Sequence, residues 1–186
     1  MKPTRFDFQK RSKLINVERR EFQPAEDIVC RASPKKDDLV ADLGCGNGYI
    51  SLPLVDSGCR VLALDSQEVM LKGLWDRASR RQRGRLCPIL AELPGIPVEK
   101  GILDHVFMVN VLHEFDDKRL MTSECHRAIR TGGLVTVVDF QKKETGMGPP
   151  LHERIAEDDL AKLFPGFNVI GRNSFEAFYQ CEFRKI

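Results

Sequence analysis

The sequence predicts an α/β fold: a doubly wound, seven-stranded, mostly parallel sheet that ends in an antiparallel hairpin. Short apolar runs alternate with helix-like stretches along the 186 residues. These runs are apolar almost throughout, which is typical of parallel strands that helices cover on both faces. The last two runs are joined by a turn that is too short for a crossover helix, which indicates a hairpin.

The predicted elements follow this alternation in order. One or two helices are expected in residues 16–33, with Pro24 at a helix start, where its missing N–H costs nothing. Strands are expected at residues 38–44, 60–65, 85–93, 104–112 and 132–140, followed by the hairpin strands 167–175 and 176–186. The intervening helices are expected at residues 48–58, 67–81 and 116–133, the last of them stopped by a C-cap at Gly132 and Gly133.

The composition indicates one globular domain. The chain has 29 Lys and Arg against 27 Asp and Glu, and 42% hydrophobic residues, which is too apolar for a disordered chain. We expect a single domain over residues 1–186, in which residues 1–37 form a helical segment that covers a pocket and residues 38–186 form the core sheet. No apolar run reaches the roughly 20 residues that span a bilayer, and none follows the basic N-terminus, so neither membrane insertion nor a signal peptide is expected.

The cysteines indicate the compartment. The chain has six, spread along its length, with no CxxC pair. Zinc sites usually bring ligands in closely spaced pairs. We therefore expect free thiols in a reducing cytoplasm and no metal site.

The most specific motif is the run DLGCGNG at residues 42–48, directly after a strand. Glycines let the backbone turn sharply and approach a ligand closely. In an open α/β sheet such a loop lies at the carboxyl ends of the strands, where ligands bind. The dinucleotide fingerprint GxGxxG would need a glycine where Tyr49 stands, which argues against a nicotinamide dehydrogenase. At the end of the next strand, Asp65 can accept two hydrogen bonds from ribose hydroxyls, although a helix N-cap is its structural alternative.

These segments resemble a known family. The run VADLGCGNGYISLPL followed by VLALD is similar to the class I S-adenosylmethionine-dependent methyltransferases, and the resemblance extends over almost the entire chain. The most similar group is the small single-domain members around the ubiquinone/menaquinone C-methyltransferases. The resemblance implies a Rossmann-like methyltransferase fold, S-adenosylmethionine as cofactor, and in-line methyl displacement to a small-molecule acceptor at O, C or S. Nothing in the matched segments is specific for a substrate.

The resemblance also implies roles for individual positions. Asp65 would bind the ribose hydroxyls, Glu92 the adenine amino group, and Asn110 would border the sulfonium. Ser66 would lie beside Asp65, and Leu93 on the adenine face. The full set of implied cofactor-binding residues is Asp42, Gly44, Cys45, Gly46, Gly48, Asp65, Ser66, Glu92, Leu93 and Asn110. The run Asn110-Val111-Leu112-His113 departs from the [DN]PP[YF] motif, which argues against methylation of base amines or glutamine amides.

Four further residues are candidates for the acceptor side. His113 follows the fourth strand and can act as an acid or base near neutral pH, and Asp139 ends the fifth strand. Their structural alternatives are a loop cap and a turn residue. His152 and Arg154 follow a Gly- and Pro-rich loop at residues 146–150 that is a candidate lid. Both could clamp an anionic acceptor, or simply start a solvated helix.

Two basic clusters leave a macromolecular substrate open. They comprise Arg77, Arg80, Arg81, Arg83 and Arg85, and at the N-terminus Lys2, Arg5, Lys10, Arg11, Lys13, Arg19 and Arg20. Nucleic-acid binding is the less favoured interpretation, because the formal net charge is only +2 and no aromatic residues interleave the arginines. An RNA or protein methyltransferase, a non-catalytic S-adenosylmethionine-binding module and a homodimer therefore remain open alternatives.

Overall fold

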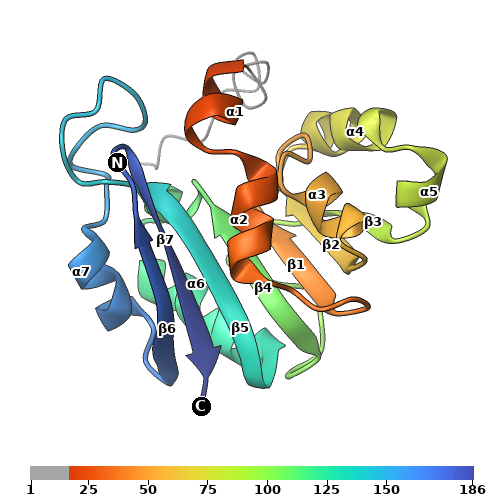
Figure 1. Cartoon of the computed structure of the whole chain (residues 1–186). Helices are drawn as coiled ribbons and strands as arrows, with labels where there is room; N and C mark the ends of the chain where they lie inside the picture. Colours follow the sequence, from red (N-terminus) through yellow and green to blue (C-terminus); the bar gives the residue numbers. More distant parts are fainter. Residues whose placement is uncertain (1–16) are drawn as a thin grey trace.

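One seven-stranded sheet organises the molecule (Figure 1). The computed structural model describes residues 17–186. The sheet has the order β3-β2-β1-β4-β5-β7-β6, and β7 runs antiparallel to both of its neighbours. The predicted fold class, with its terminal hairpin, is confirmed. The strands are β1 Leu39–Leu43, β2 Arg60–Asp65, β3 Leu86–Leu90, β4 Leu103–Val109, β5 Ile129–Phe140, β6 Phe167–Ser174 and β7 Phe178–Lys185.

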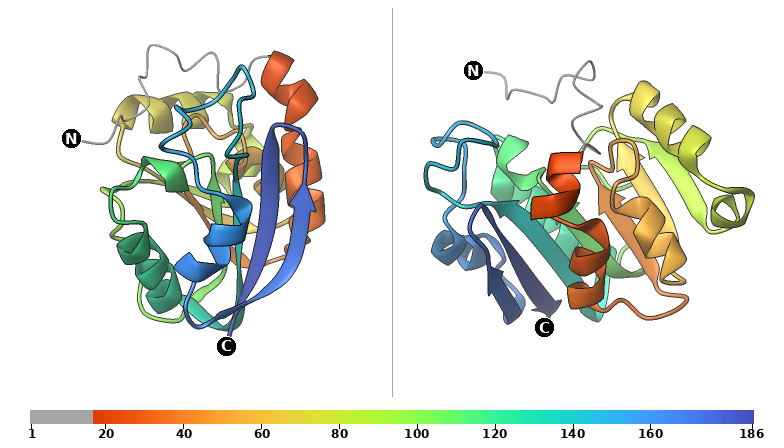
Figure 2. Two further views of the ribbon diagram at one scale, coloured as in Figure 1. Left: turned by 90° about the vertical axis from the view of Figure 1, so that its left-hand side faces the viewer. Right: turned by 45° about the horizontal axis from the view of Figure 1, so that its top comes forward.

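Helices cover both faces of the sheet, as Figure 2 shows edge-on. Helices α2, α3 and α4 pack on one face, and α6 packs with the α7 region on the other. The two predicted N-terminal helices are present, and Pro24 is the N-cap of the second. The helical elements are α1 Val17–Phe22, α2 Ala25–Ala32, α3 Ser51–Asp56, α4 Glu68–Arg77, α5 Arg80–Arg83, η2 Leu112–Glu114, α6 Lys118–Ala128, α7 Glu157–Leu160 and η3 Ala161–Leu163.

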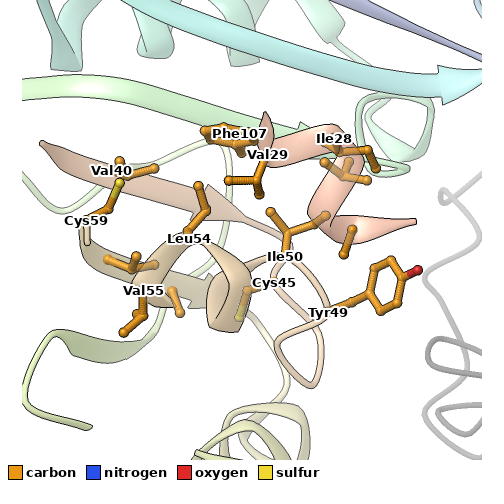
Figure 3. Close-up of a cluster of buried hydrophobic side chains, with 14 of the residues drawn as sticks. Ile28, Val29, Val40, Cys45, Tyr49, Ile50, Leu54, Val55, Cys59 and Phe107 are labelled. Carbon is orange, nitrogen blue, oxygen red and sulfur yellow. The ribbon is translucent and has the colours of Figure 1, made fainter. Parts of the chain in front are cut away.

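The core on the α2–α3 face is a continuous apolar cluster (Figure 3). Ile28 of α2 and Leu54 of α3 are completely buried, together with Val40 and Phe107 from the strands beneath them. Each such side chain contributes about 1.5–3 kcal/mol relative to exposure. The amphipathic pattern of these short helices thus fixes them on the sheet, and the loops that precede them are fixed with them.

The helix predicted over residues 67–81 is present as α4 over Glu68–Arg77, but its continuation to residue 81 is wrong, because the structure breaks it at Ala78 and Ser79 before α5. Ala78 is extended, with φ −68° and ψ 127°. The Ser79 hydroxyl accepts from the Gln82 backbone N–H at 3.3 Å, and the Gln82 side chain accepts from the Ser79 N–H at 2.9 Å. This reciprocal capping box starts a new helix, so α4 cannot continue.

The predicted glycine C-cap at Gly132 and Gly133 is also wrong. Helix α6 ends at Ala128, and the backbone is already extended at Ile129. The pairing of β5 with β4 then jumps from Leu103–Ile129 to His105–Leu134, so the two glycines lie in a bulge. A Cβ on Gly133 would lie 2.9 Å from the Asp104 carbonyl oxygen, which explains why the bulge takes glycine there.

The parallel strands all deliver their following loops to one edge of the sheet, at the top of Figure 1. Residues 44–50, 66–67 and 110–117 follow β1, β2 and β4, and residues 141–153 follow β5. Segments far apart in sequence therefore meet at this edge. In the part of the chain that the structure describes, no helix is long and apolar enough to cross a bilayer.

Candidate active site

A cavity of about 920 Å³ opens at the carboxyl ends of β1, β2 and β4. Its walls come from the loops after these strands, from α1, and from the loop after β5. Its volume falls within the range of about 300–1,000 Å³ that is usual for small-molecule sites. Nine of the ten expected cofactor-binding residues line it: Asp42, Gly44, Cys45, Gly46, Asp65, Ser66, Glu92, Leu93 and Asn110.

The glycine loop owes its course to backbone geometry. Gly44 and Gly46 have φ of 67° and 53°, a left-handed conformation that favours glycine. The tenth expected residue, Gly48, does not line the cavity. A Cβ at Gly48 would lie 2.2 Å from Leu74 Cδ1, so this glycine permits close packing of the loop against α4 instead.

Asp65 holds the loop and presents a carboxylate to the cavity. Its Oδ2 accepts from the Gly46 N–H and its Oδ1 from the Gln67 N–H, both at 2.9 Å. Burial raises its pKa, and these amide hydrogen bonds oppose that rise. Each carboxylate oxygen can accept a second hydrogen bond. Asp65 can therefore receive two neighbouring hydroxyl groups from a ligand while it keeps both amides, so the predicted ribose contact and the helix-start contact are compatible.

Asp42 lies beneath the loop as a buried acid. It accepts from the Ser51 hydroxyl at 2.5 Å and is 2% exposed. Burial raises its pKa to about 7, although the Ser51 hydrogen bond and the Arg19 charge lower it. The Arg19 guanidinium is itself buried, 4.1 Å from the centre of the Tyr49 ring, and burial lowers its pKa to about 10. A positive group that enters the cavity would favour ionisation of Asp42.

Asn110 joins the end of β4 to the N-terminal helices. It adopts a left-handed φ of 58°. Its side-chain amide donates to Gln23 Oε1 at 2.7 Å and accepts from Gln23 Nε2 at 3.3 Å. The Tyr49 hydroxyl donates to the Gln23 carbonyl at 2.8 Å. Sequence reasoning placed Arg19 only in a basic cluster and missed Gln23 and the cavity-lining Phe22, since no spacing pattern connects individual residues of the N-terminal segment to loops so far along the chain.

His113 and Asp139 form a buried pair at the other side of the cavity. His113 Nδ1 lies 2.7 Å from Asp139 Oδ1, and the His113 backbone N–H donates to Oδ2 at 3.3 Å. Burial lowers the pKa of His113, but the adjacent Asp139 carboxylate outweighs this, and the net pKa is raised. An acceptor at Nδ1 assigns the proton to that nitrogen, which leaves Nε2 as the basic atom. His113 lines the cavity, and in residues 17–186 Nε2 has no hydrogen-bond partner.

Glu114, which sequence reasoning did not single out, also lines the cavity. Burial raises its pKa to about 7; the His113 charge lowers it, and Asp139, Asp65 and Glu153 raise it further. Its position directly after His113 in the sequence is the signal that could have identified it as a cavity residue. Two titratable groups thus lie next to each other at the end of β4.

His152 and Arg154 do not lie where an anion clamp requires. The His152 side chain is 80% exposed and does not line the cavity. Arg154 is buried, and its N–H groups donate hydrogen bonds within its own loop rather than toward the cavity. Its guanidinium donates to the carbonyls of Gln141, Lys143, Met147 and Pro149 and to the Thr145 hydroxyl. Arg154 therefore shapes residues 141–150, of which 146–150 line the cavity.

The chain matches the family described as "Methyltransferase domain" over residues 41–137, more than half of its length. This chain belongs to the methyltransferase-domain family. The resemblance to class I methyltransferases is thereby confirmed, while the narrower resemblance to the ubiquinone/menaquinone group stays a prediction.

Individual relatives and solved structures that are similar to this methyltransferase domain are also methyltransferases. A malonyl-[acyl-carrier protein] O-methyltransferase of Hamiltonella defensa is 31% identical over 100 residues, which is 54% of this chain and 37% of the relative. An uncharacterized methyltransferase of Synechocystis is 29% identical over 131 residues, 69% of this chain and 58% of the relative. A structure of a SAM-dependent methyltransferase from Aquifex aeolicus superposes with a TM-score of 0.88 at 22% identity, over 98% of this chain and 100% of that one. The chain spans well under half the length of the first of these relatives.

The arginine cluster of the methyltransferase domain is largely occupied by internal contacts. Arg77 donates to the Asn47 carbonyl at 2.6 Å, and Arg83 to the Trp75 carbonyl at 2.8 Å. Arg85 pairs with Asp37 at 2.7 Å. These contacts favour structural roles for the three arginines over the binding of nucleic-acid phosphates. Of the N-terminal cluster, Lys2, Arg5, Lys10, Arg11 and Lys13 lie outside the described residues.

Proposed function

We propose that the protein is an S-adenosylmethionine-dependent methyltransferase that acts on a small molecule. One observation carries the proposal. A single cavity joins a carboxylate that can accept two hydroxyls, Asp65, to a basic imidazole nitrogen held by a buried acid, the His113–Asp139 pair. The first feature suits a nucleoside cofactor and the second suits an acceptor that must lose a proton.

The residues present fit the cofactor. Asp65 would accept from the two ribose hydroxyls, and Glu92 and Leu93 would border the adenine. Asp42, with its neighbour Ser51, supplies negative charge near the glycine loop, where the cationic amino-acid end of the cofactor would lie. When bound, the cofactor supplies an activated methyl group on a sulfonium.

His113 would serve as the general base. Asp139 fixes the imidazole through Nδ1 and stabilises the imidazolium that forms when Nε2 takes a proton. Such a base contributes about 10²–10⁴-fold to a rate where the acceptor must be deprotonated. Asp139 is completely buried, so it acts through His113 and does not touch the acceptor.

Helix α1 and the loop at residues 146–150 would cover the reacting groups. Arg19 and Phe22 of α1 lie at one wall of the cavity, and Met147 at another. The amide pair between Gln23 and Asn110 holds α1 at this position. Closure by these segments would exclude water, which strengthens electrostatic interactions inside the site.

The direct test is transfer of a labelled methyl group. The protein is incubated with methyl-labelled S-adenosylmethionine and a small-molecule extract, and then with RNA and protein fractions in parallel. We expect label in the small-molecule fraction. Label only in RNA or protein would overturn the acceptor class, and cofactor binding without any transfer would favour a non-catalytic module.

A further inference from the structure

The acceptor side of the cavity is acidic. The residues that follow β4 and β5 bring four carboxylates to its wall: Glu114, Asp116, Asp117 and Glu153. Of the cavity's lining residues between 17 and 186, the sole Lys or Arg is Arg19, which lies against Tyr49 and close to Asp42 on the cofactor side. As far as residues 17–186 are concerned, an anionic acceptor would therefore meet like charge next to the reacting group, without a cation to receive it.

The described part of the chain neutralises these carboxylates only weakly. The negative charges of Asp139, Asp65 and Glu153 raise the pKa of Glu114 and so disfavour its ionised form. The charge of His113 opposes them and favours the ionised form. Glu153 has a long contact, 3.8 Å, with the exposed His152. Asp117 is partly engaged, because it caps α6 through the Leu120 N–H at 3.0 Å. A cation in the cavity would relieve this repulsion.

A metal ion does not suit this arrangement. Between residues 17 and 186, no three His, Cys, Asp or Glu side chains are grouped so that they could hold one. The cavity is also lined by apolar side chains, namely Phe22, Phe115, Leu120, Phe140 and Met147. Carboxylates beside aromatic and aliphatic walls favour an organic cation with an apolar body.

His113 provides an independent observation that points to the same ligand. The residue is 9% exposed and lines the cavity, and its Nε2 atom has no partner within the described chain. A basic nitrogen at that position can take a proton from a group that arrives protonated. An acceptor carboxylate would need no such base.

We propose that the methyl acceptor is a protonated amine on an apolar, aromatic-sized body, rather than the O, C or S acceptor that the resemblance implied; this rests on the proposed function. The acidic wall binds the ammonium form, and His113 Nε2 removes one N–H proton. The freed nitrogen lone pair forms the N–C bond to the methyl carbon while the S–C bond breaks, and its electron pair stays on sulfur. The products are the methylated ammonium and the neutral thioether S-adenosylhomocysteine, and the imidazolium returns its proton to solvent.

Three probes of matched size test the acceptor class: phenethylamine, phenethyl alcohol and hydrocinnamate, which are a cation, a neutral molecule and an anion. Each is titrated by calorimetry into the protein saturated with S-adenosylhomocysteine, at a pH above neutrality. We expect phenethylamine to bind about tenfold or more tightly than hydrocinnamate. Glu114→Gln should weaken the amine about tenfold and leave the alcohol unchanged. Glu99→Gln, an exposed carboxylate that does not line the cavity, is the charge-matched control and should change nothing.

Equal or tighter binding of hydrocinnamate overturns the proposal, and so does an amine affinity that Glu114→Gln leaves intact. If Glu114→Gln does not fold, Glu153→Gln takes its place, with circular dichroism to verify folding. Binding of S-adenosylhomocysteine is measured first and separately. If the nucleoside binds and the amine does not, only the acceptor class falls. If the nucleoside itself does not bind, the proposed function falls.

Discussion

At the scale of single residues, the site depends on acids that are buried yet matched to specific partners. Asp139 accepts from the His113 ring, the His113 backbone and the Phe140 backbone, the last at 2.8 Å. Burial of an acid without such donors would be costly. The sequence named both members of the pair, because each follows the carboxyl end of a strand. It could not show that they touch, since that depends on β4 and β5 being neighbours in the sheet.

The pair gives a prediction for Asp139→Asn. Removal of the carboxylate charge should lower the pKa of His113, because that charge is what raises it. The rising limb of the rate against pH should therefore move to lower pH. The plateau should fall about a hundredfold or more, since the imidazolium loses its stabilising partner. Turnover of labelled methyl groups against pH measures both, and an unmoved limb would contradict the assignment of His113 as base.

At the scale of elements, the strands were predictable and the helix ends were not. The strands of the sheet are nearly continuous apolar runs, so their positions follow from composition. The break at Ser79 depends on a local capping box between Ser79 and Gln82, a spacing that the sequence shows but that the apolar pattern of residues 67–81 outweighed. The bulge at Gly132 depends on the register with β4, which is a tertiary detail. In the site, the glycine loop and Asp65 were predictable from spacing. A cover from residues 1–37 was also expected, but the particular α1 residues that line the cavity and the contacts of Arg154 were not, because they join segments distant in sequence.

Gly48→Ala tests the role of loop packing. The new Cβ would lie 2.2 Å from Leu74 Cδ1, at a φ of 86°, so we expect a loss of about 1–3 kcal/mol in unfolding free energy. Gly146→Ala is the matched control: its φ is 65°, but nothing lies within 4 Å of the new Cβ. Denaturant titrations should show the smaller loss at Gly146. Equal losses would mean that backbone strain alone accounts for both.

Arg154→Met tests the loop after β5. Methionine keeps an apolar stem but removes the donors that hold the carbonyls of Gln141, Lys143, Met147 and Pro149. Limited proteolysis should cut within residues 141–153 at least several-fold faster in the variant. Binding of S-adenosylhomocysteine should change little, since none of these contacts reaches Asp65. Unchanged proteolysis would show that the loop holds its shape without Arg154.

At the scale of the whole molecule, the fold brings its acids to one edge and leaves them partly unneutralised. The near balance of 29 basic against 27 acidic residues hides this asymmetry. Asp42 and Glu114 both have a pKa raised to about 7 by burial. The folded state therefore retains protons that the unfolded chain would release at lower pH. Burial of these acids lowers the stability of the ligand-free protein, as is common where a site must bind charge.

The sign of this linkage gives a prediction for pH. A carboxyl whose pKa is raised by folding favours the folded state only while it is protonated. The contribution of these two carboxyls to stability should therefore fall as pH rises from about 4, the unfolded pKa, to about 7. Buried His105, whose pKa burial lowers to about 3, contributes in the opposite direction over this window. His113 also has a raised pKa, so its contribution to the stability of the fold is likewise lost as pH rises above its unfolded pKa. Asp42→Asn should therefore raise the melting temperature relative to the wild type by an amount that grows from about pH 4 to about pH 7; a difference between the two proteins that does not grow with pH would contradict the account.

The central claim is that this cavity binds S-adenosylmethionine through Asp65, and calorimetric titration of S-adenosylhomocysteine tests it most directly. The wild-type protein should bind one equivalent, and Asp65→Ala should bind about a hundredfold more weakly, because it loses two charge-assisted hydrogen bonds to the ribose. Glu99→Gln serves again as the control for charge. No binding to the wild-type chain, or equal affinity for Asp65→Ala, would contradict the assignment of this cavity.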